Sequence, residues 1–251
     1  MRRVKLTVAY DGTDYCGWQV QNNGPTVEGE LNRALSELTG ERITVIGASR
    51  TDAGVHGRGN VAVFDTNTPI PPARLVYALN GKLPDDIVAV KSEEVPPDWH
   101  PRHCDSVKTY EYRILNQEMP DPLRRRDTWH VSFPLDIERM RRAAEYLKGE
   151  HDFKSFCSAQ SEVENTVRTI YELNLEKTGS LITIRVKGSG FLYNMVRIIA
   201  GTLMGAGRGA YSPEEVKRML EARDRVCAGM TAPPQGLTLI GIEYPGAPSL
   251  S

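Results

Sequence analysis

The sequence lacks the cysteine and histidine patterns of metal-binding and disulfide-stabilised proteins. Its 251 residues include four cysteines with no C-x-x-C pair and five histidines with no H-E-x-x-H pattern. Scattered cysteines argue against a zinc site and against a disulfide framework. We therefore expect neither a structural nor a catalytic metal.

Long apolar stretches are also missing. No run of about 18 apolar residues occurs, so no membrane-spanning helix is predicted. The chain begins Met-Arg-Arg-Val-Lys and passes directly into an alternating strand pattern, without an apolar segment of the signal-peptide type. We therefore expect a cytoplasmic protein.

A basic excess is absent as well. The chain has 31 lysines and arginines against 32 aspartates and glutamates, for a formal net charge of -1. Many nucleic-acid-binding proteins carry a clear basic excess, so the overall charge does not point to one. The local cluster at residues 124–126, three arginines, is by itself typical of a solvated loop.

What the sequence does contain is a repeated order of elements. Alternation and helical spacing predict β-α-β-β-α-β, the ferredoxin-like motif, in which an antiparallel sheet packs against two helices on one face. The same order recurs after a proline-rich crossing near residue 100. We predict an α+β fold of two ferredoxin-like halves, residues 1–104 and 105–251. The first half has strands at 3–10, 43–47, 59–66 and 86–95 and helices at 26–39 and 71–79; the second has strands at 106–115, 128–133, 167–175, 181–186 and 237–244 and helices from 137, 191 and 212.

Residues 47–57 form a loop that is rich in functional side chains. They join two strand-like runs and contain Arg50, Asp52, His56 and three glycines. A plain hairpin turn needs only two to five residues, and rigid scaffolds often present functional groups on longer loops. The chemistry leaves two interpretations open: a reactive site, or a surface loop in which Asp52 caps a turn. The role of His56 also stays open.

Arg197 is the only charged residue between Phe191 and Gly207. A guanidinium in such apolar surroundings is costly unless it is paired and hydrogen-bonded. Its helix contains no acid, so a partner has to come from another segment, and Asp52 is a candidate. Alternatively, Arg197 extends to solvent at a helix edge.

Aromatic residues offer a third signal. Tyr110 and Tyr112 lie two residues apart on a predicted strand and share one face. They either present a ring to a flat substrate or belong to the core, and without other information the core is favoured. Trp18 lies in a polar loop, where an aromatic ring either stacks on a base or covers a core edge, and the core is again favoured.

Residues 50–56, Arg-Thr-Asp-Ala-Gly-Val-His, resemble the catalytic motif of the tRNA pseudouridine synthase I family. Further matching motifs follow in order along almost the whole chain. A departure occurs at residues 57–60, Gly-Arg-Gly-Asn, where relatives often have Ala and Gln; we expect no effect on catalysis. The other matching segments are residues 10–13, 17–21, 100–102, 110–112, 151–153, 190–197, 232–233 and 236–237.

The resemblance implies an enzyme that isomerises uridine to pseudouridine at positions 38, 39 and 40 of the tRNA anticodon arm. It implies that Asp52 is the catalytic residue and that Tyr110 packs on the target base and assists proton removal. It further implies that Arg197 pairs with the aspartate and that Arg50 helps to hold the nucleotide out of the stack. The family needs no cofactor or metal and works as a homodimer.

Two rival functions are weaker. A non-catalytic RNA-binding or chaperone protein with paired ferredoxin-like domains would share the fold, but the sequence has no RNP pattern of sheet aromatics. A hydrolase with a carboxylate pair needs two acids at a fixed separation, and residues 47–57 contain only Asp52.

Overall fold

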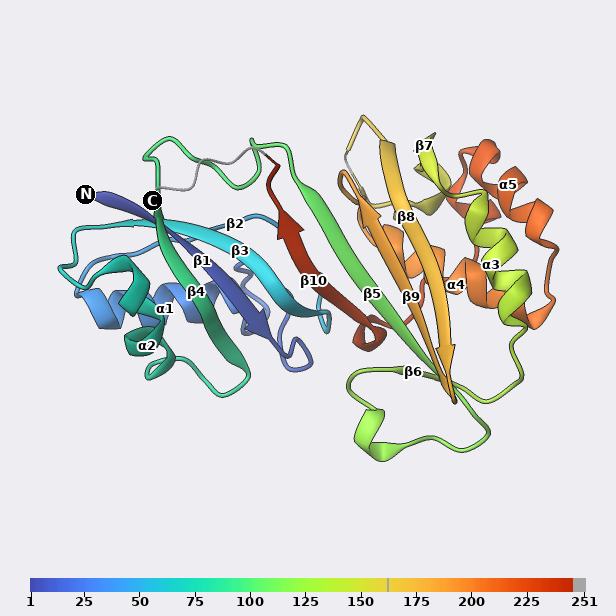
Figure 1. Cartoon of the computed structure of the whole chain (residues 1–251), viewed down its shortest axis with the longest axis horizontal. Helices are drawn as coiled ribbons and strands as arrows, with labels where there is room; N and C mark the ends of the chain where they lie inside the picture. Colours follow the sequence, from blue (N-terminus) through green and yellow to red (C-terminus); the bar gives the residue numbers. More distant parts are fainter. Residues whose placement is uncertain (162, 246–251) are drawn as a thin grey trace. The chain divides into compact units, whose positions relative to one another are not determined.

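The computed structural model describes residues 1–161 and 163–245, which form two compact units (Figure 1). The first unit comprises Met1–Ser106 together with residues 239–245, and the second comprises the described residues of Val107–Thr238. The division expected at residues 104 and 105 assigned the final strand to the second half. In the structure most of that strand clusters with the first unit instead. No helix within the described residues is long and apolar enough to cross a membrane.

The first unit has the predicted order of strands and helices. Strand β1 pairs antiparallel with β3 on one side and with β4 on the other. The strand order is β4-β1-β3-β10, and β2 pairs with β3. The elements are β1 (Arg2–Tyr10), α1 (Val27–Thr39), β2 (Ile46–Gly47), β3 (His56–Thr66), η1 (Pro72–Arg74), α2 (Leu75–Asn80), β4 (Ile87–Val95) and β10 (Leu237–Glu243).

Alternation along β1 builds the core of this unit. Val4, Leu6 and Val8 are fully buried and face the apolar stripe of α1, whereas the intervening side chains lie on the other face of the strand. Helix α1 begins at Thr26, whose hydroxyl accepts a hydrogen bond from the Gly29 amide at 3.2 Å, and such a cap contributes about 1 kcal/mol. Trp18 is 1% exposed within the same core, which confirms its predicted packing.

The strand predicted at residues 43–47 is mostly irregular, since β2 covers only Ile46–Gly47. Side chains of α1 explain the difference. The Ile43 amide donates to Ser36 Oγ at 3.0 Å, and the Val45 amide donates to Asn32 Oδ1 at 2.8 Å. These amides are therefore satisfied by the helix rather than by a neighbouring strand.

The second unit is also α+β. Its strand order is β5-β9-β8-β7, with antiparallel neighbours, and the short β6 runs parallel to β5. The elements are β5 (Val107–Asn116), η2 (Pro122–Arg124), β6 (Trp129–Val131), α3 (Ile137–Glu145), β7 (Gly149–Asp152), η3 (Lys154–Phe156), β8 (Val167–Thr178), β9 (Leu181–Gly188), α4 (Met195–Arg208), α5 (Pro213–Ala222), η4 (Arg225–Cys227) and η5 (Pro234–Gly236).

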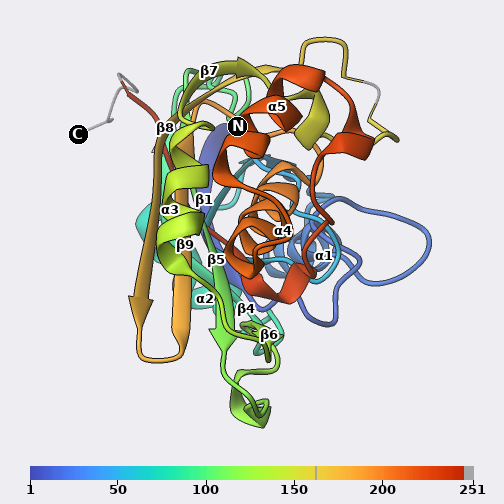
Figure 2. The ribbon, with the colours of Figure 1, turned by 90° about the vertical axis from the view of Figure 1, so that its right-hand side faces the viewer.

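Helix α4 is the buried helix of this unit, as its apolar sequence predicts. It begins at Met195 rather than at residue 191, because Asn194 adopts a left-handed conformation with φ of 61°. Helix α3 packs on α4, α5 and β8, and Figures 1 and 2 show these helices gathered beside β8 and β9. The capping box predicted at Ser212 is present, with Glu215 as its reciprocal partner.

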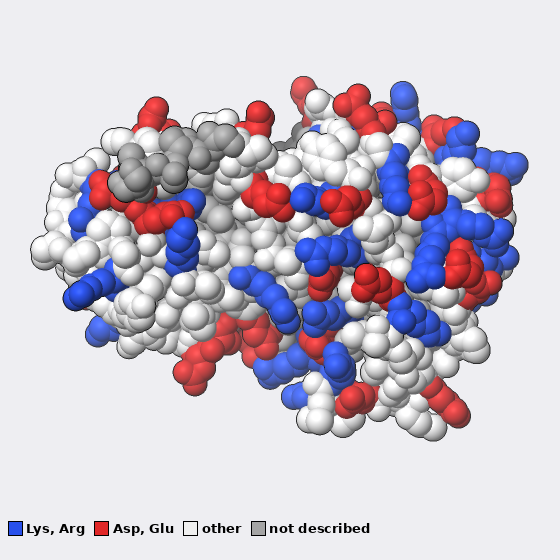
Figure 3. Space-filling view, in the orientation of Figure 1, with Lys and Arg blue, Asp and Glu red and all other residues white. Residues whose placement is uncertain are grey.

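The sheet face of the second unit that points away from these helices is polar. Glu111 on β5 accepts hydrogen bonds from Arg185 of β9 at 3.0 Å and from Arg113 of its own strand at 3.3 Å. Figure 3 shows Lys and Arg interspersed with Asp and Glu over this part of the surface. The face thus carries charges of both signs rather than a uniform basic patch.

Candidate functional site

The Asp52 loop, residues 48–55, links β2 to β3 in the first unit. It is shorter than expected because β3 already begins at His56. The Ala48 amide donates to the Val61 carbonyl at 2.7 Å, so the loop leaves directly from a strand pair. The loop is therefore mounted on regular structure at both ends.

Asp52 opens a tight turn within this loop. The Val55 amide donates to the Asp52 carbonyl at 3.1 Å, and Gly54 has a φ of 77°, a conformation that glycine adopts without strain. The Asp52 side chain is half-buried, whereas the neighbouring Arg50 is exposed. A half-buried carboxylate on a closed turn has a defined position and remains accessible to a ligand.

The segment between β1 and α1 supports the turn from below. The Trp18 amide donates to the Thr51 carbonyl at 3.0 Å. Gly17, with a φ of 95°, lies so close that a Cβ there would be 2.7 Å from the same carbonyl and 3.1 Å from the Asp52 carbonyl carbon. A Cβ on Gly12 would lie even closer to the Val55 carbonyl oxygen. Two glycines thus let one loop lie directly beneath another.

His56 is buried at the end of the loop. Its Nδ1 accepts a hydrogen bond from the Gly12 amide at 3.1 Å, and Asp11 Oδ1 lies at the same distance. Through these two contacts, His56 connects the Asp52 loop to the segment between β1 and α1.

Tyr110 lies on β5 of the second unit, opposite Val186 of β9. Its ring is 7% exposed and meets the edge of Phe191, with ring centroids 5.2 Å apart and an interplanar angle of 84°. Tyr112 is fully buried, and its hydroxyl donates to the Pro233 carbonyl at 2.8 Å. Burial strongly raises the pKa of Tyr112, which therefore stays neutral.

Arg197 lies in the first turn of α4 and is half-buried. Its Nε donates to the Ala232 carbonyl at 2.8 Å, and its Nη1 donates to Asn194 Oδ1 at 2.7 Å. The Ala232 amide in turn donates to the Arg197 carbonyl at 3.1 Å. The guanidinium is thus fixed in direction by its own unit, as expected for a buried cation.

The predicted residues fall into two sets. The first unit presents Arg50 and Asp52 on one loop, and the second unit holds Tyr110 on a strand and Arg197 at a helix start. Sequence reasoning placed Tyr10 on the apolar face of a strand and in a family motif, and noted Asn60 only within a departure from the family pattern, but it missed what both contribute to the loop. The Tyr10 hydroxyl lies 2.8 Å from Thr51 Oγ1, and Asn60 Nδ2 lies 2.9 Å from the Ser49 carbonyl oxygen. Asn60 Nδ2 also lies 3.3 Å from the Tyr10 oxygen.

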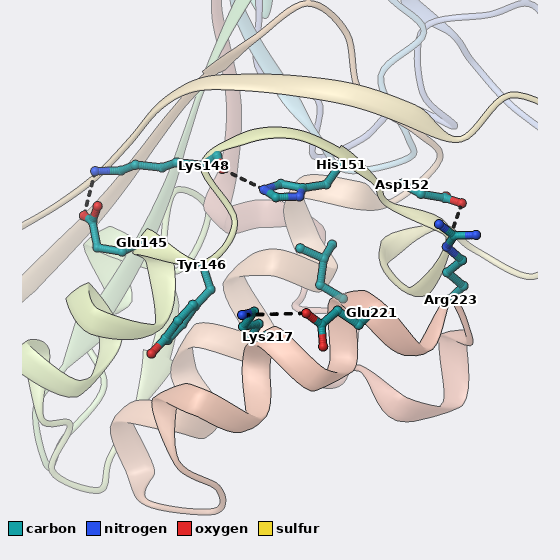
Figure 4. A pocket seen from close by; sticks show the side chains of 9 residues that line it. Glu145, Tyr146, Lys148, His151, Asp152, Lys217, Glu221 and Arg223 are labelled. Carbon is teal, nitrogen blue, oxygen red and sulfur yellow. Dashed lines mark hydrogen bonds and ion pairs between the residues drawn. The ribbon is translucent and has the colours of Figure 1, made fainter.

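A cavity of about 540 Å³ in the second unit contains none of the predicted site residues (Figure 4). It lies between the end of α3, β7 and α5, and its lining is charged. Its cations are already matched by acids, so it offers no net charge to a ligand. The pairs are Lys148–Glu145 at 2.6 Å, Lys217–Glu221 at 3.8 Å and Arg223–Asp152 at 3.3 Å.

No group of three or more metal-ligating side chains occurs in the part of the chain that the structure describes. The Asp52 loop of the first unit presents a carboxylate and a cation, and the second unit by itself holds Tyr110 on a strand and Arg197 at a helix start. A carboxylate presented on a loop suits acid–base or nucleophilic chemistry.

Known proteins resemble this chain over nearly its full length. A family described as tRNA pseudouridine synthase matches residues 6–103 and 143–245. The chain is 50% identical to "tRNA pseudouridine synthase A" of Thermoanaerobacter sp. (strain X514) over 244 residues, which cover 97% of this chain and 100% of that protein. The protein of the same name from Brevibacillus brevis is also 50% identical over the same shares, and that from Clostridium acetobutylicum is 47% identical.

Proposed function

Because the chain belongs to the tRNA pseudouridine synthase family, we propose that Asp52 is the residue with which it isomerises uridine in tRNA. The enzyme is an isomerase. The reaction breaks the bond between C1′ of the ribose and N1 of uracil, rotates the base, and forms a bond from C1′ to C5. The proton on C5 is released to solvent. A carboxylate can serve either as nucleophile or as base in this sequence.

The observation that carries the proposal is the presentation of Asp52. It is half-buried, opens a turn closed by Val55, and follows Thr51, whose carbonyl is held by Trp18. These hydrogen bonds keep the carboxylate oxygens of Asp52 in place, and positioning of this kind supplies a large part of the rate enhancement of an enzyme.

Tyr110 and Arg197 complete the proposed machinery. The Tyr110 ring packs on the extruded uracil, since a base is commonly held by an aromatic face. Arg197 pairs with Asp52 and keeps the carboxylate ionised against the effect of burial. The guanidinium is already directed by Ala232 and Asn194, so it loses little further freedom on pairing.

Arg50 is the proposed contact to the displaced nucleotide. A uracil inside a helix is inaccessible, and enzymes that act on bases extrude the nucleotide first. Arg50 is exposed on the Asp52 loop, where a guanidinium can contact a phosphate or a base. We propose positions 38, 39 and 40 of the anticodon arm as targets, because nucleotides near a loop cost less to extrude.

We further propose that the enzyme works as a homodimer in the cytoplasm and needs no metal or cofactor. The reaction is an isomerisation, so it consumes no oxidant or reductant. Light scattering should give twice the chain mass, and EDTA should leave the rate unchanged.

The test is position-resolved conversion of tRNA. Transcripts carry C5-tritiated uridine only at position 38, 39 or 40, or only at a position outside the anticodon arm. The proposal predicts tritium release from the first three and none from the last. Binding without any release would instead support a non-catalytic RNA-binding protein.

A further inference from the structure

Three buried polar side chains form a chain of hydrogen bonds beneath the Asp52 loop. The Tyr10 hydroxyl lies 2.8 Å from Thr51 Oγ1, and Asn60 Nδ2 donates to the Tyr10 oxygen at 3.3 Å. The same amide donates to the Ser49 carbonyl at 2.9 Å. Asn60 is 0% exposed, Tyr10 5% and Thr51 7%, so these bonds form away from water. Buried polar groups that are hydrogen-bonded in this way hold a specific local geometry.

The Tyr10 and Thr51 hydroxyls share one hydrogen bond, in which either oxygen can donate. The Tyr10 oxygen also accepts from Asn60 Nδ2, so it joins both neighbours. The chain thus runs from the buried β3 residue Asn60, through the last residue of β1, to the residue that precedes Asp52.

Packing leaves the Tyr10 ring little room to move. A Cβ on Gly57 would lie 2.6 Å from two carbons of the ring, so the ring rests directly on the backbone of β3. On another side it meets Trp18, with ring centroids 5.8 Å apart. A ring held in this way places its hydroxyl at a fixed point under the loop.

Thr51 is consequently held at two places. Its carbonyl accepts from the Trp18 amide at 3.0 Å, and its side chain contacts Tyr10. A backbone bond alone would still allow rotation about the bonds that lead to Asp52. The side-chain contact adds a second restraint on that rotation.

We propose that Tyr10 and Asn60 are positioning residues that act through the Thr51 hydroxyl to fix the Asp52 carboxylate for reaction. The inference rests on the proposed catalytic role of Asp52. A misplacement of about 1 Å in an active site can lower the rate roughly 100-fold. Tyr10 and Asn60 touch no substrate in this account, so tRNA affinity should not depend on the Tyr10 hydroxyl.

The test removes one hydroxyl at a time and keeps the shape. Tyr10→Phe and Thr51→Val should each lower the single-turnover rate of tritium release at saturating tRNA roughly 10- to 100-fold. The dissociation constant for tRNA should stay within about twofold of the wild type. Thr51→Ser, which keeps the hydroxyl, should recover most of the rate. The double variant Tyr10→Phe/Thr51→Val should be no slower than either single variant, because both remove the same contact.

Tyr244→Phe is the matched control. Tyr244 has a partly buried hydroxyl in the first unit, donating to the Pro101 carbonyl at 3.1 Å. Its loss should lower the unfolding temperature about as much as Tyr10→Phe without changing the rate. Equal rates for the two phenylalanine variants would overturn the positioning role, as would a Thr51→Ser variant as slow as Thr51→Val.

Asp52→Asn separates this inference from the assignment on which it rests. If Asp52→Asn is inactive and Tyr10→Phe is fully active, the positioning role alone is wrong. If Asp52→Asn keeps the wild-type rate, both are wrong. Inactive Asp52→Asn together with a slowed Tyr10→Phe of unchanged tRNA affinity supports both.

Discussion

At the scale of single residues, Arg197 shows how a costly charge is accommodated. Its sequence context indicated that a partner had to come from outside its own helix. The Ala232 carbonyl meets part of that need, and Asn194 supplies a second acceptor from the turn before α4. The aspartate partner stays a prediction. The sequence could not predict the Ala232 carbonyl as a partner, because every residue has a backbone carbonyl and the residue type does not show which one accepts.

Replacement of Arg197 distinguishes charge from geometry. Arg197→Lys should retain more activity than Arg197→Met, because the ammonium keeps a positive charge beside the carboxylate, although it cannot reproduce both hydrogen bonds of the guanidinium. The rate of tritium release from tRNA measures the effect. Arg208→Met, at the exposed end of α4, should leave that rate unchanged. Equal losses in the Lys and Met variants would contradict the role of charge.

Gly17 occupies a position beside the Asp52 loop where a side chain has no room. An alanine there combines a φ of 95° with a Cβ 2.7 Å from the Thr51 carbonyl. Gly17→Ala should cost roughly 1–3 kcal/mol in the free energy of unfolding and also displace the turn of Asp52. The rate of the folded enzyme should therefore fall.

Gly40→Ala supplies the comparison for Gly17→Ala. Gly40 ends α1 with a φ of 71°, but nothing lies within 4 Å of its Cβ position. The Gly40→Ala variant should have a lower free energy of unfolding because of backbone strain, while its rate of tritium release stays at the wild-type value. If both variants lose stability alone, close approach at Gly17 has no bearing on activity.

At the scale of elements, regular patterns were predictable and local exceptions were not. The alternation of β1 and the caps of α1 and α5 depend on residues near one another in sequence, and the structure confirms them. The late start of β2 depends on Asn32 and Ser36, which lie on a helix one element away. The late start of α4 depends on a left-handed Asn194, a conformation that the residue type permits but does not require.

The pairing of β1 with β3 includes a charge pair that should respond to pH. Arg3 and Asp65 lie directly opposite, joined by two hydrogen bonds of 2.9 and 2.7 Å. The bonds from Arg3 hold the pKa of Asp65 below its ordinary value of 3.8. A carboxyl with a lowered pKa in the folded state stabilises the fold above 3.8, and that contribution disappears as the pH falls through the folded-state value.

Asp65→Asn should therefore lower the free energy of unfolding at neutral pH, by less than about 1 kcal/mol because the pair is partly solvated. The difference from the wild type should shrink as the pH is lowered below 3.8. Urea titrations at several pH values measure it. Glu94→Gln, an exposed carboxylate on β4, serves as reference. A difference that grows toward acid pH would reverse the sign and refute the account.

At the scale of the whole molecule, two halves were predicted, residues 1–104 and 105–251, and the chain forms two compact units. The last strand differs from the prediction, because most of β10 clusters with the first unit although it follows the second unit in sequence. Element order alone could not show this, because a final strand fits either half equally well. The four candidate site residues stood out by their chemistry in the sequence, and the family motifs gave their roles. Their local supports, such as Tyr10 and Asn60, lie on buried strands whose side chains look like ordinary core in the sequence.

Binding of tRNA should rest largely on phosphate contacts despite a net charge of -1. Counterions released from RNA make such binding weaken as salt rises, with a slope of about −0.7 to −0.9 per phosphate contacted. Filter binding of tRNA between low and high potassium chloride measures the slope. Affinity that is independent of salt would contradict a phosphate-based interaction.

The central claim is that the Asp52 carboxylate carries the reaction. The most direct measurement is the single-turnover release of tritium from C5-labelled tRNA by Asp52→Asn, beside Asp85→Asn as an exposed aspartate of the same unit. The amide keeps the size of the side chain but removes its charge and basicity. We expect no detectable release by Asp52→Asn, with tRNA binding retained, and a wild-type rate for Asp85→Asn. Release at the wild-type rate by Asp52→Asn would contradict it.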